Sequence, residues 1–308
     1  MRKLYCVIVT YNGMKWIERC ISSLLTSTYP VHIIVFDNCS TDATCSFIQK
    51  NYPQVQLIRS NKNLGFGQAN NAAIATALDG AADAVFLLNQ DASVTPETLA
   101  QLMLSQTGSP EFGIISPVHF NGAATGIDIN FLQYFRKSEL DNWISSALLQ
   151  TREQYSLVNT EFVNAAAWLL SAGCLRKVGG FDPFFFHYGE DINYCQRTLY
   201  HGFKIGILPV AVIYHDREDR FIRPPSAAAV LKREWINLAN YFSDIRHEDF
   251  LKLVFRRQLR YLVNLLIACL TFRFSAARFN AAMMGKTLWA IPAIRQSRKF
   301  ARCSNWYK

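Results

Sequence analysis

The residues of this chain that could do chemistry come in short polar groups, each placed directly after a run of apolar residues. Four groups lie in the first hundred residues, at 10–13, 37–42, 61–67 and 89–91. A fifth, the acidic pair Glu190 and Asp191, follows an aromatic run in the second half. Carboxylates and carboxamides can hold a nucleotide, and a carboxylate can also bind a divalent cation or take a proton. These residue types fit a nucleotide site with an acid–base group, provided that the fold brings them together.

Four short apolar runs precede the first four groups, and helix-length segments separate the runs. The runs cover residues 4–9, 31–36, 55–58 and 84–88, with helices expected at about 14–28, 42–51 and 66–78. Runs that are apolar on both faces are typical of a parallel sheet covered by helices. The order predicts a βαβαβ unit, in which ligands bind beyond the carboxyl ends of the strands. Any one polar group is more typical of an ordinary turn, but four at one sheet edge favour a site.

Two common nucleotide-binding motifs are missing from the sequence. No Gly-x-Gly-x-x-Gly follows the first run, the pair Gly65 and Gly67 lacks a third glycine, and there is no P-loop. A nicotinamide or flavin dehydrogenase and P-loop phosphoryl transfer are therefore disfavoured. The phosphates of a nucleotide must then be neutralised otherwise, and Asp91, after the fourth run, suits one Mg²⁺ or Mn²⁺ ion. The alternative is that Asp91 belongs to the turn before a helix near Pro96.

Five ordered motifs together resemble those of the family 2 glycosyltransferases, and within that family most closely the bacterial rhamnosyltransferase branch. They lie at residues 7–12, 37–42, 63–71, 87–91 and 179–191, so the resemblance covers about residues 4–216. It implies a GT-A fold, which is an α/β fold with a Rossmann-like, mostly parallel sheet flanked by helices. It also implies an inverting mechanism, a nucleotide-sugar donor and a divalent cation, Mg²⁺ or Mn²⁺.

The resemblance assigns the donor nucleotide mainly to the polar groups of the first half. Asp37 stands where the family contacts the pyrimidine, and a carboxylate, which accepts but cannot donate, favours uracil or thymine over cytosine. Gly65 and Gly67 are expected to let the backbone approach the diphosphate. Arg197 stands where a basic residue commonly contacts the donor phosphates. The expected donor-binding residues are Thr10, Tyr11, Asn12, Asp37, Asn38, Asn63, Gly65, Gly67, Asn70, Asn71, Asn89, Gln90 and Arg197.

Asp91 occupies the last position of the family's metal motif, where this sequence departs from the stricter form. Asn89 stands where many members have an aspartate, and one carboxylate binds a cation more weakly than two. His215, after a strand-like run, matches a histidine that in related enzymes reaches the metal or the diphosphate. The expected metal ligands are therefore Asp91 and His215, and the part of Asn89 stays open. A histidine at a strand end is as often an ordinary surface residue.

The acidic pair carries the chemistry that the resemblance implies. An inverting transfer needs a base that takes the proton of the acceptor hydroxyl. The family places this base at Asp191, with Glu190 orienting the acceptor or supporting the loop. The alternative is that both acids only stabilise the N-terminus of a helix over 189–201. Asn193 stands where the family often has a further aspartate.

Aromatic residues near the acidic pair are expected to line the acceptor side, because aromatic faces pack against sugar rings. These residues are Trp168, Phe185, Phe186, His187 and Tyr188. The alternative is that they belong to the core. Residues 119–160 are interpreted only as an acceptor-facing insertion.

The positive charge is concentrated toward the C-terminus. Residues 1–216 have 14 Lys and Arg against 17 Asp and Glu, whereas residues 217–308 have 18 against 6. The apolar run 261–272, flanked by arginines, is too short to span a bilayer as a helix but could lie at an anionic membrane surface. Packing against the catalytic domain or in a homodimer is the alternative. No motif that reads nucleic acid is recognised, so no nucleic-acid partner is expected.

The sequence thus predicts a catalytic domain over 1–216, with a donor half at about 1–118 and an acceptor half at 119–216. A basic, mostly helical region follows at 217–308. Eight scattered cysteines indicate free thiols, and the N-terminus does not resemble a signal peptide, so we expect a cytoplasmic protein, peripheral at the inner membrane face.

The predicted activity is inverting, metal-dependent transfer of a sugar to a lipid-linked glycan in bacterial surface polysaccharide synthesis. The branch resemblance favours L-rhamnose from dTDP-rhamnose as the donor. A UDP-sugar transferase of the same family and an inactive relative that acts as a binding partner are the alternatives. A nucleotidyltransferase is disfavoured, because the sequence has no Gly-rich N-terminal triphosphate loop.

Overall fold

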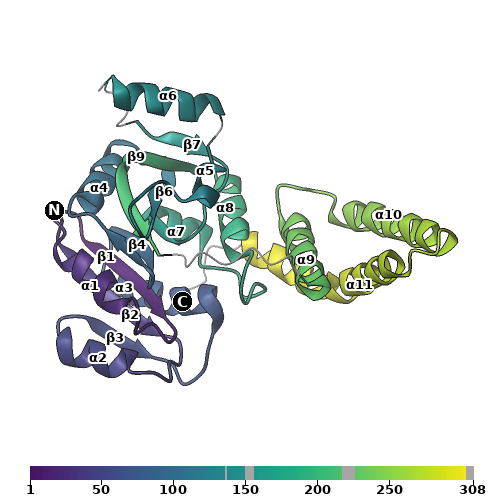
Figure 1. Cartoon of the computed structure of the whole chain (residues 1–308), viewed down its shortest axis with the longest axis horizontal. Coiled ribbons are helices and arrows are strands. Elements are labelled where there is room, and N and C mark those ends of the chain that lie inside the picture. Colours follow the sequence, from purple (N-terminus) through teal and green to yellow (C-terminus); the bar gives the residue numbers. More distant parts are fainter. Residues whose placement is uncertain (136, 150–155, 217–225, 303–308) are drawn as a thin grey trace.

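The fold consists of a mixed β-sheet with helices on both faces, from which three C-terminal helices project to one side (Figure 1). The computed structural model describes residues 1–135, 137–149, 156–216 and 226–302. The predicted boundary at 216/217 falls where a stretch outside the described residues begins.

Nine strands form the sheet in the order β3-β2-β1-β4-β8-β6-β9-β5, and β7 pairs with β9. Their bounds are β1 Leu4–Thr10, β2 Val31–Asp37, β3 Gln56–Arg59, β4 Ala84–Asn89, β5 Ala92–Val94, β6 Phe112–Asn121, β7 Val158–Thr160, β8 Ala167–Ser171 and β9 Lys204–His215. Strands β5, β7 and β8 run against the direction of the other six. The predicted α/β fold with a mostly parallel sheet is confirmed, and the reversed strands are additions that the sequence analysis did not identify.

The helices on the two faces of the sheet enclose two separate apolar clusters. Helices α1 Ile17–Leu25, α2 Thr44–Asn51 and α4 Thr98–Gly108 contribute to one cluster, whereas α3 Gly65–Asp79, α7 Ala172–Val178 and α8 Glu190–Tyr200 contribute to the other. Alternate residues of β1 serve both, since Val7 packs toward α3 and Ile8 toward α1. Each such side chain, fully buried, stabilises the fold by roughly 1.5–3 kcal/mol. This two-sided burial explains why the strand runs are apolar throughout.

The helices predicted in the first half correspond to α1, α2 and α3 and are confirmed. The predicted border between donor and acceptor halves at 118/119 falls inside β6, so no structural boundary lies there. Strand β8 from the second half also inserts between β4 and β6. The two halves therefore share one continuous sheet. Two further helices, α5 Ile129–Leu132 and α6 Lys137–Leu148, precede β7.

The projecting helices are α9 Ala227–Ser243, α10 Phe250–Leu270 and α11 Phe274–Arg302, which we call the arm (Figure 1). They share a third apolar cluster that includes Phe242, Val254, Met283 and Ile294. The run predicted at 261–272 is the second half of the longer helix α10 and continues into the turn after it. Among the described helices, none combines the length and the apolar character needed to cross a bilayer.

Candidate active site

The carboxyl ends of β1, β2 and β4 bring the first-half residues to one edge, as the sequence predicts. Thr10 pairs with Asp37 in the β1–β2 register, and Val9 pairs with Asn89 in the β1–β4 register. The Asp37 side chain is only 2% exposed. Its carboxylate accepts hydrogen bonds from Thr10 Oγ1 at 3.1 Å and from the Ser40 backbone N–H at 3.0 Å. These bonds fix the carboxylate at the sheet edge, and its contact with the base of a nucleotide stays a prediction.

The turn after β1 is held by two amide side chains that the sequence analysis assigned to the donor. Asn12 adopts a positive φ of 49°, and its Oδ1 accepts from the Thr41 N–H at 2.8 Å. Gln90 accepts from the Tyr11 N–H at 3.0 Å and donates to the Tyr11 carbonyl at 3.3 Å. The side-chain oxygens of both residues thus hold the turn, and the contact of these two residues with a donor stays a prediction. Tyr11 itself is 49% exposed and remains available to a ligand.

A second amide network joins β2 to the start of α3. Asn63 Oδ1 accepts from the Gly65 N–H at 2.8 Å and from Asn38 Nδ2 at 3.0 Å. Asn38 Oδ1 accepts in turn from the Leu64 N–H at 2.7 Å. Asn38 and Asn63 therefore shape the loop that leads into α3.

The two glycines at the start of α3 have a packing role that the sequence analysis did not identify. Gly65 has a φ of +76°, and a Cβ there would collide with the Phe186 carbonyl oxygen. A Cβ on Gly67 would lie 2.8 Å from Phe181 Cβ. The space beside both glycines is filled by the loop of residues 179–189, which we call the acceptor loop. Gly65 and Gly67 allow this loop to pack closely, and their approach to a diphosphate stays a prediction.

Two further asparagines of α3 form hydrogen bonds within the protein. Asn71 forms a pair of hydrogen bonds with the Phe181 backbone, accepting from its N–H at 2.7 Å and donating to its carbonyl at 2.8 Å. Asn70 is 2% exposed and donates to the Phe66 carbonyl at 2.9 Å. Both amides have partners within the protein, and their assignment to the donor stays a prediction. Asn71 ties the acceptor loop to α3.

The acidic pair begins α8, and the backbone enters the helix through two residues of positive φ, Tyr188 at 72° and Gly189 at 92°. Glu190 is 6% exposed, and its Oε2 is buried without a hydrogen-bond partner. Burial, with a smaller contribution from the charge of Asp191, raises the pKa of Glu190 to about 7. Asp191 is half-buried, and its Oδ1 accepts from the Ile192 N–H at 2.8 Å. Asp191 is therefore the more accessible carboxylate of the two.

The raised pKa of Glu190 has a testable consequence for stability. The pKa of Glu190 rises from 4.5 in the unfolded chain to about 7 in the folded protein. Its contribution to the free energy of unfolding is therefore largest below pH 4.5 and is lost as the pH rises through about 7. Replacing Glu190 by glutamine removes this dependence. The free energy of unfolding, measured in urea, should be compared between Glu190→Gln and the parent. From pH 5 to pH 8 this difference should change in favour of the variant by up to about 3 kcal/mol. The exposed Glu97→Gln should show no such shift, and a flat difference for Glu190→Gln would contradict the assignment.

The structure brings the two expected metal ligands together. His215 Nε2 lies 3.2 Å from Asp91 Oδ1, because the β5–β9 pairing sets His215 opposite Ala92, the residue after Asp91. His215 is 2% exposed, and its Nδ1 has no hydrogen-bond partner. Within the described part of the chain, no group of three or more His, Cys, Asp or Glu side chains is arranged to hold a metal. The protein therefore offers one carboxylate and one imidazole at this point, with Asn89 at the end of the neighbouring β4.

Arg197 and two of the aromatic residues lie in the interior, in contrast to their predicted contacts with substrate. Arg197 is 1% exposed and donates to the carbonyls of Val178 at 2.9 Å and Gly180 at 2.5 Å. Trp168 is fully buried and stacks on Phe181, and Phe185 is 4% exposed. These three are structural residues, because no surface is left for a ligand. Phe186, His187 and Tyr188 are exposed and stay candidates for the acceptor side.

The sequence analysis did not identify the contacts that the arm makes with the acceptor loop. Ser297 of α11 donates to Asp182 Oδ2 at 2.5 Å, and Ser243 of α9 lies 3.4 Å from Asn193 Nδ2. A Cβ on Gly189 would meet Asn240 Nδ2 at 2.5 Å. No local pattern marks these serines, since each acts through a residue far away in the sequence. The arm thus contacts the acceptor loop and α8, and supports the turn that carries the acidic pair.

Two family models match the sequence. Residues 5–156 match the model described as Glycosyl transferase family 2, and residues 86–282 match the model described as Glycosyltransferase (GlcNAc). Together these matches extend from β1 into α11.

Two curated proteins are similar over most of the chain. The chain is 27% identical over 262 residues to the N-acetylglucosaminyl-diphospho-decaprenol L-rhamnosyltransferase of Mycobacterium tuberculosis. This match covers 77% of this chain and 84% of that protein. It is 23% identical over 222 residues to the dTDP-rhamnosyl transferase RfbF of Shigella flexneri, covering 71% of each.

Two solved structures are similar in fold. The mannosyltransferase PcManGT of Pyrobaculum calidifontis, in complex with GDP-Man and Mn²⁺, has a TM-score of 0.56 at 19% identity, covering 98% of this chain and 84% of that one. Residues 1–349 of S. aureus TarS, in complex with UDP, have a TM-score of 0.53 at 17% identity. This match covers 77% of this chain and 65% of that one. At these identities the likeness shows the fold alone.

Proposed function

Because the chain belongs to glycosyl transferase family 2 and has the GT-A fold of its structural neighbours, we propose that it moves a sugar from a nucleoside diphosphate to a hydroxyl of a lipid-linked glycan. One observation carries the proposal. The acidic pair of α8 packs against the start of α3, with Glu190 Cβ 3.8 Å from the Cβ position of Gly67. The loop before α3 is tied through Asn38 to the edge that holds Asp37. These contacts support the proposal that the residues at the carboxyl ends of β1, β2 and β4, which we call the nucleotide cradle, and the acidic pair belong to one site.

The similar proteins support a particular sugar and acceptor. Both named relatives are rhamnosyltransferases, and the name of the mycobacterial one specifies a diphospho-decaprenol-linked acceptor. We therefore assign L-rhamnose, carried by dTDP, as the transferred sugar. A UDP-sugar is the second candidate donor, because a carboxylate such as Asp37 accepts equally well from the ring N–H of uracil or thymine.

We assign the base of an inverting transfer to Asp191. The acceptor hydroxyl attacks the anomeric carbon from the face opposite the leaving nucleotide, and its proton passes to the Asp191 carboxylate. The half-buried position of Asp191 leaves it open to an acceptor, whereas Glu190 is buried beneath. Glu190 is then a positioning residue that holds a proton near neutral pH and so limits the repulsion between the two acids.

We assign the divalent cation, Mg²⁺ or Mn²⁺, to Asp91 and His215. A carboxylate and an imidazole fit a cation that keeps its other positions for phosphate oxygens and water. Such a cation would neutralise negative charge on the departing diphosphate. The unpartnered Nδ1 of His215 is unusual for a metal ligand, whose second nitrogen normally has a hydrogen-bond partner. Asp91 is therefore the ligand to test first.

Calorimetric titration of the full chain with dTDP, UDP and GDP, each with and without Mn²⁺ or Mg²⁺, tests the donor site. We expect metal-dependent binding of a pyrimidine diphosphate, weakened at least about tenfold in Asp91→Ala. The exposed Asp249→Ala on the arm should bind like the parent. Equal binding with and without metal would overturn the metal assignment, and no binding of any nucleotide would overturn the proposed function.

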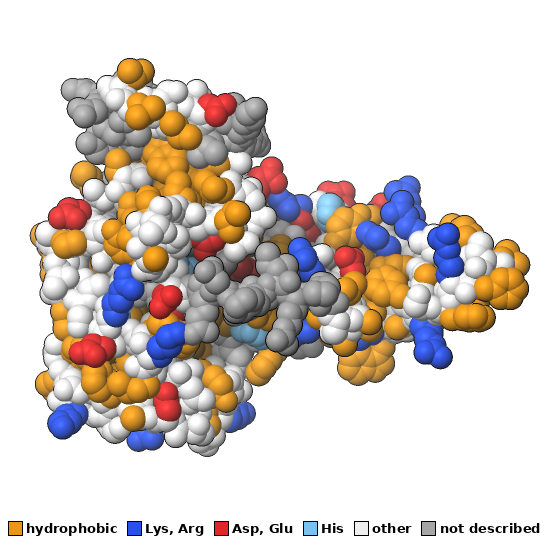
Figure 2. Space-filling view, viewed as in Figure 1, with side chains coloured by type: hydrophobic (Ala, Val, Ile, Leu, Met, Phe, Trp, Pro, Cys, Tyr) orange, Lys and Arg blue, Asp and Glu red, His pale blue; other side chains and the backbone are white. Residues whose placement is uncertain are grey.

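We further propose that the arm lies on the surface of an anionic membrane. The outer face of α10 carries an exposed apolar stripe, bordered by basic residues at 252, 256 and 260. The stripe consists of Leu251, Phe255, Leu259, Leu262, Leu266 and Leu270. Hydrophobic and basic side chains also gather on the arm in Figure 2. An amphipathic helix of this kind binds flat in the headgroup region, where a lipid-linked acceptor would be found.

Sedimentation with vesicles tests this placement. The parent should bind vesicles that contain phosphatidylglycerol, and Leu262→Ser combined with Leu266→Ser should reduce binding at least about tenfold, since each buried leucine contributes roughly 1.5–3 kcal/mol. Leu104→Ser, an exposed leucine of α4, is the matched control. Failure of the parent to bind, together with a concentration-dependent dimer that the double variant lacks, would show that a second copy covers the stripe instead.

A further inference from the structure

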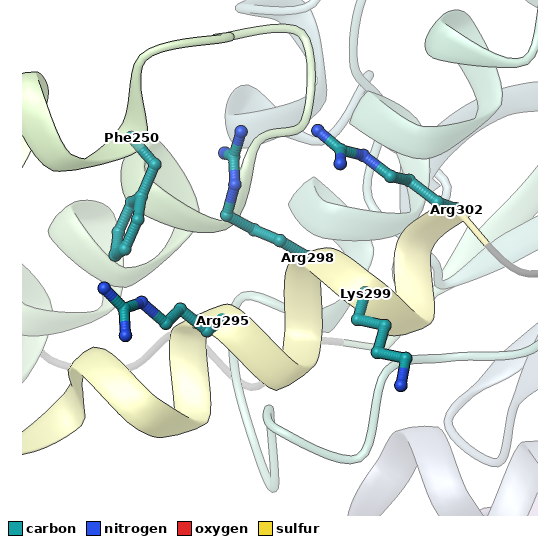
Figure 3. A pocket seen from close by; sticks show the side chains of 5 residues that line it. All are labelled: Phe250, Arg295, Arg298, Lys299 and Arg302. Carbon is teal, nitrogen blue, oxygen red and sulfur yellow. The ribbon is translucent and has the colours of Figure 1, made fainter.

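A cavity of about 310 Å³ lies at the base of the arm, between the last turns of α11 and the start of α10. It is lined by Phe250, Arg295, Arg298, Lys299 and Arg302, and we call it the arginine pocket. Figure 3 shows the guanidinium groups of Arg295 and Arg298 on the side of α11 that faces Phe250, with Arg302 beside them. Neither the residues at the carboxyl ends of β1, β2 and β4 nor the acidic pair lines this pocket.

One basic side chain of the pocket, Arg298, is held in a fixed position. Arg298 is 7% exposed, and its guanidinium donates to the carbonyls of Phe242 at 3.0 Å and Asp244 at 2.5 Å. It also lies over the Phe250 ring, 5.5 Å from the ring centroid. A buried arginine held by carbonyls keeps its full positive charge in place. The pocket therefore has one immobilised cation and an aromatic wall.

The other cations of the pocket lack anionic partners. Arg295, Lys299 and Arg302 are exposed, and within the described residues none of them forms an ion pair. Of the acids close to Phe250 in the sequence, Asp244 pairs with Arg246 at 2.7 Å and Asp249 lies 4.0 Å from Lys252. In the part of the chain that the structure describes, none of these acids, Glu248 included, forms an ion pair with a cation of the pocket. Burial lowers the pKa of Arg298, and repulsion by the charge of Arg302 adds to this effect, whereas Asp244 opposes it. An anion with several oxygens would relieve this repulsion.

The chemistry of the lining selects the kind of anion. The guanidinium groups of Arg295 and Arg302 can match phosphate oxygens in pairs. Arg298, whose Nη1 and Nη2 donate to the carbonyls of Phe242, Asp244 and His247, adds a fixed positive charge, so the lining suits a group with more than one negative charge. The aromatic wall suits an anion attached to hydrocarbon. We propose that the arginine pocket binds the phosphate or diphosphate group of a lipid, either a bilayer headgroup or the lipid-linked acceptor. The second source rests on the proposed function, whereas the site itself does not.

The position of the pocket gives such binding a consequence for the active site. Arg298 follows Ser297, which donates to Asp182 of the acceptor loop. Phe300, two residues further on, lies under the guanidinium of Arg197 at 5.4 Å. A lipid phosphate held by this part of α11 would therefore be fixed against the same elements that position Asp191.

Titration with inorganic pyrophosphate tests the site separately from the donor site. The full chain carries Asp91→Ala, and EDTA is present throughout, so that failure of the proposed function cannot affect the result. We expect binding that is at least tenfold weaker when Arg295→Gln and Arg302→Gln are added. The matched control, Arg233→Gln with Arg278→Gln, removes two exposed charges from the same arm and should bind like its parent. No binding, or equal loss in both double variants, would overturn the proposal.

Competition with vesicles then identifies the source of the phosphate. Displacement of pyrophosphate by phosphatidylglycerol vesicles would assign a bilayer headgroup. Displacement only by neutral vesicles that contain a polyprenyl diphosphate sugar would assign the acceptor. If neither displaces it, the pocket does not take a lipid and the proposal fails, even where pyrophosphate binds.

Discussion

Replacing Asp191 by asparagine should reduce the turnover of sugar transfer by about 10²- to 10⁴-fold while nucleotide affinity is unchanged. Asparagine keeps the size of the side chain but cannot take the proton of the acceptor hydroxyl. The loss should appear in the release of nucleoside diphosphate, measured at saturating donor and acceptor. Because Asp191 is assigned to the acceptor hydroxyl and asparagine has the same size, calorimetric binding of dTDP or UDP should equal that of the parent.

A matched change separates this effect from a general effect of charge. Asp249→Asn removes one carboxylate from the arm, where Asp249 is exposed and paired only loosely with Lys252 at 4.0 Å. Its turnover should equal that of the parent. If Asp191→Asn turns over like the parent while Glu190→Gln is inactive, the base is Glu190 and the two roles are exchanged. If the parent binds nucleotide but transfers no sugar from any donor, the chain is an inactive relative.

The parallel part of the fold could be read from the sequence, because each strand there is a short run buried on both faces. The resemblance to family 2 glycosyltransferases and the mostly parallel α/β sheet are both confirmed. The same runs also gave the edge at which Thr10 and Asp37 meet. The reversed strands were missed since β5 and β7 span three residues each and β8 lies far from its partners in the sequence.

The roles of single side chains were harder to predict than their neighbourhood. Asn71 and Gln90 stand in a predicted binding region, yet their amides bond to the backbones of Phe181 and Tyr11. An amide near a ligand site can serve the ligand or the loop, and the sequence pattern is the same for both. Only the distance to a backbone partner, set by packing between remote segments, decides between them. The contact of Ser297 with Asp182 is another long-range feature of this kind.

Arg197→Met should lower the free energy of unfolding by about 3–5 kcal/mol, because it leaves two buried carbonyls without a donor. The lost partners are the carbonyls of Val178 and Gly180, with Asn193 Oδ1 as a third at 2.9 Å. Methionine preserves most of the apolar length of the side chain, so the loss reports on the guanidinium. Urea unfolding at pH 7 measures it directly.

The same variant distinguishes a structural arginine from a phosphate-binding one. With Arg197 buried beneath the acceptor loop, the folded fraction of Arg197→Met should bind dTDP or UDP as the parent does. A contact to the donor phosphates would instead weaken nucleotide binding at unchanged stability, and that result would restore the role implied by the family pattern. Arg176→Met, an exposed arginine on α7, should change stability by less than about 0.5 kcal/mol. Arg197 links α8 to the start of the acceptor loop through the carbonyls of Val178 and Gly180, so the position of Asp191 depends on this buried side chain. The expected loss of stability measures that dependence.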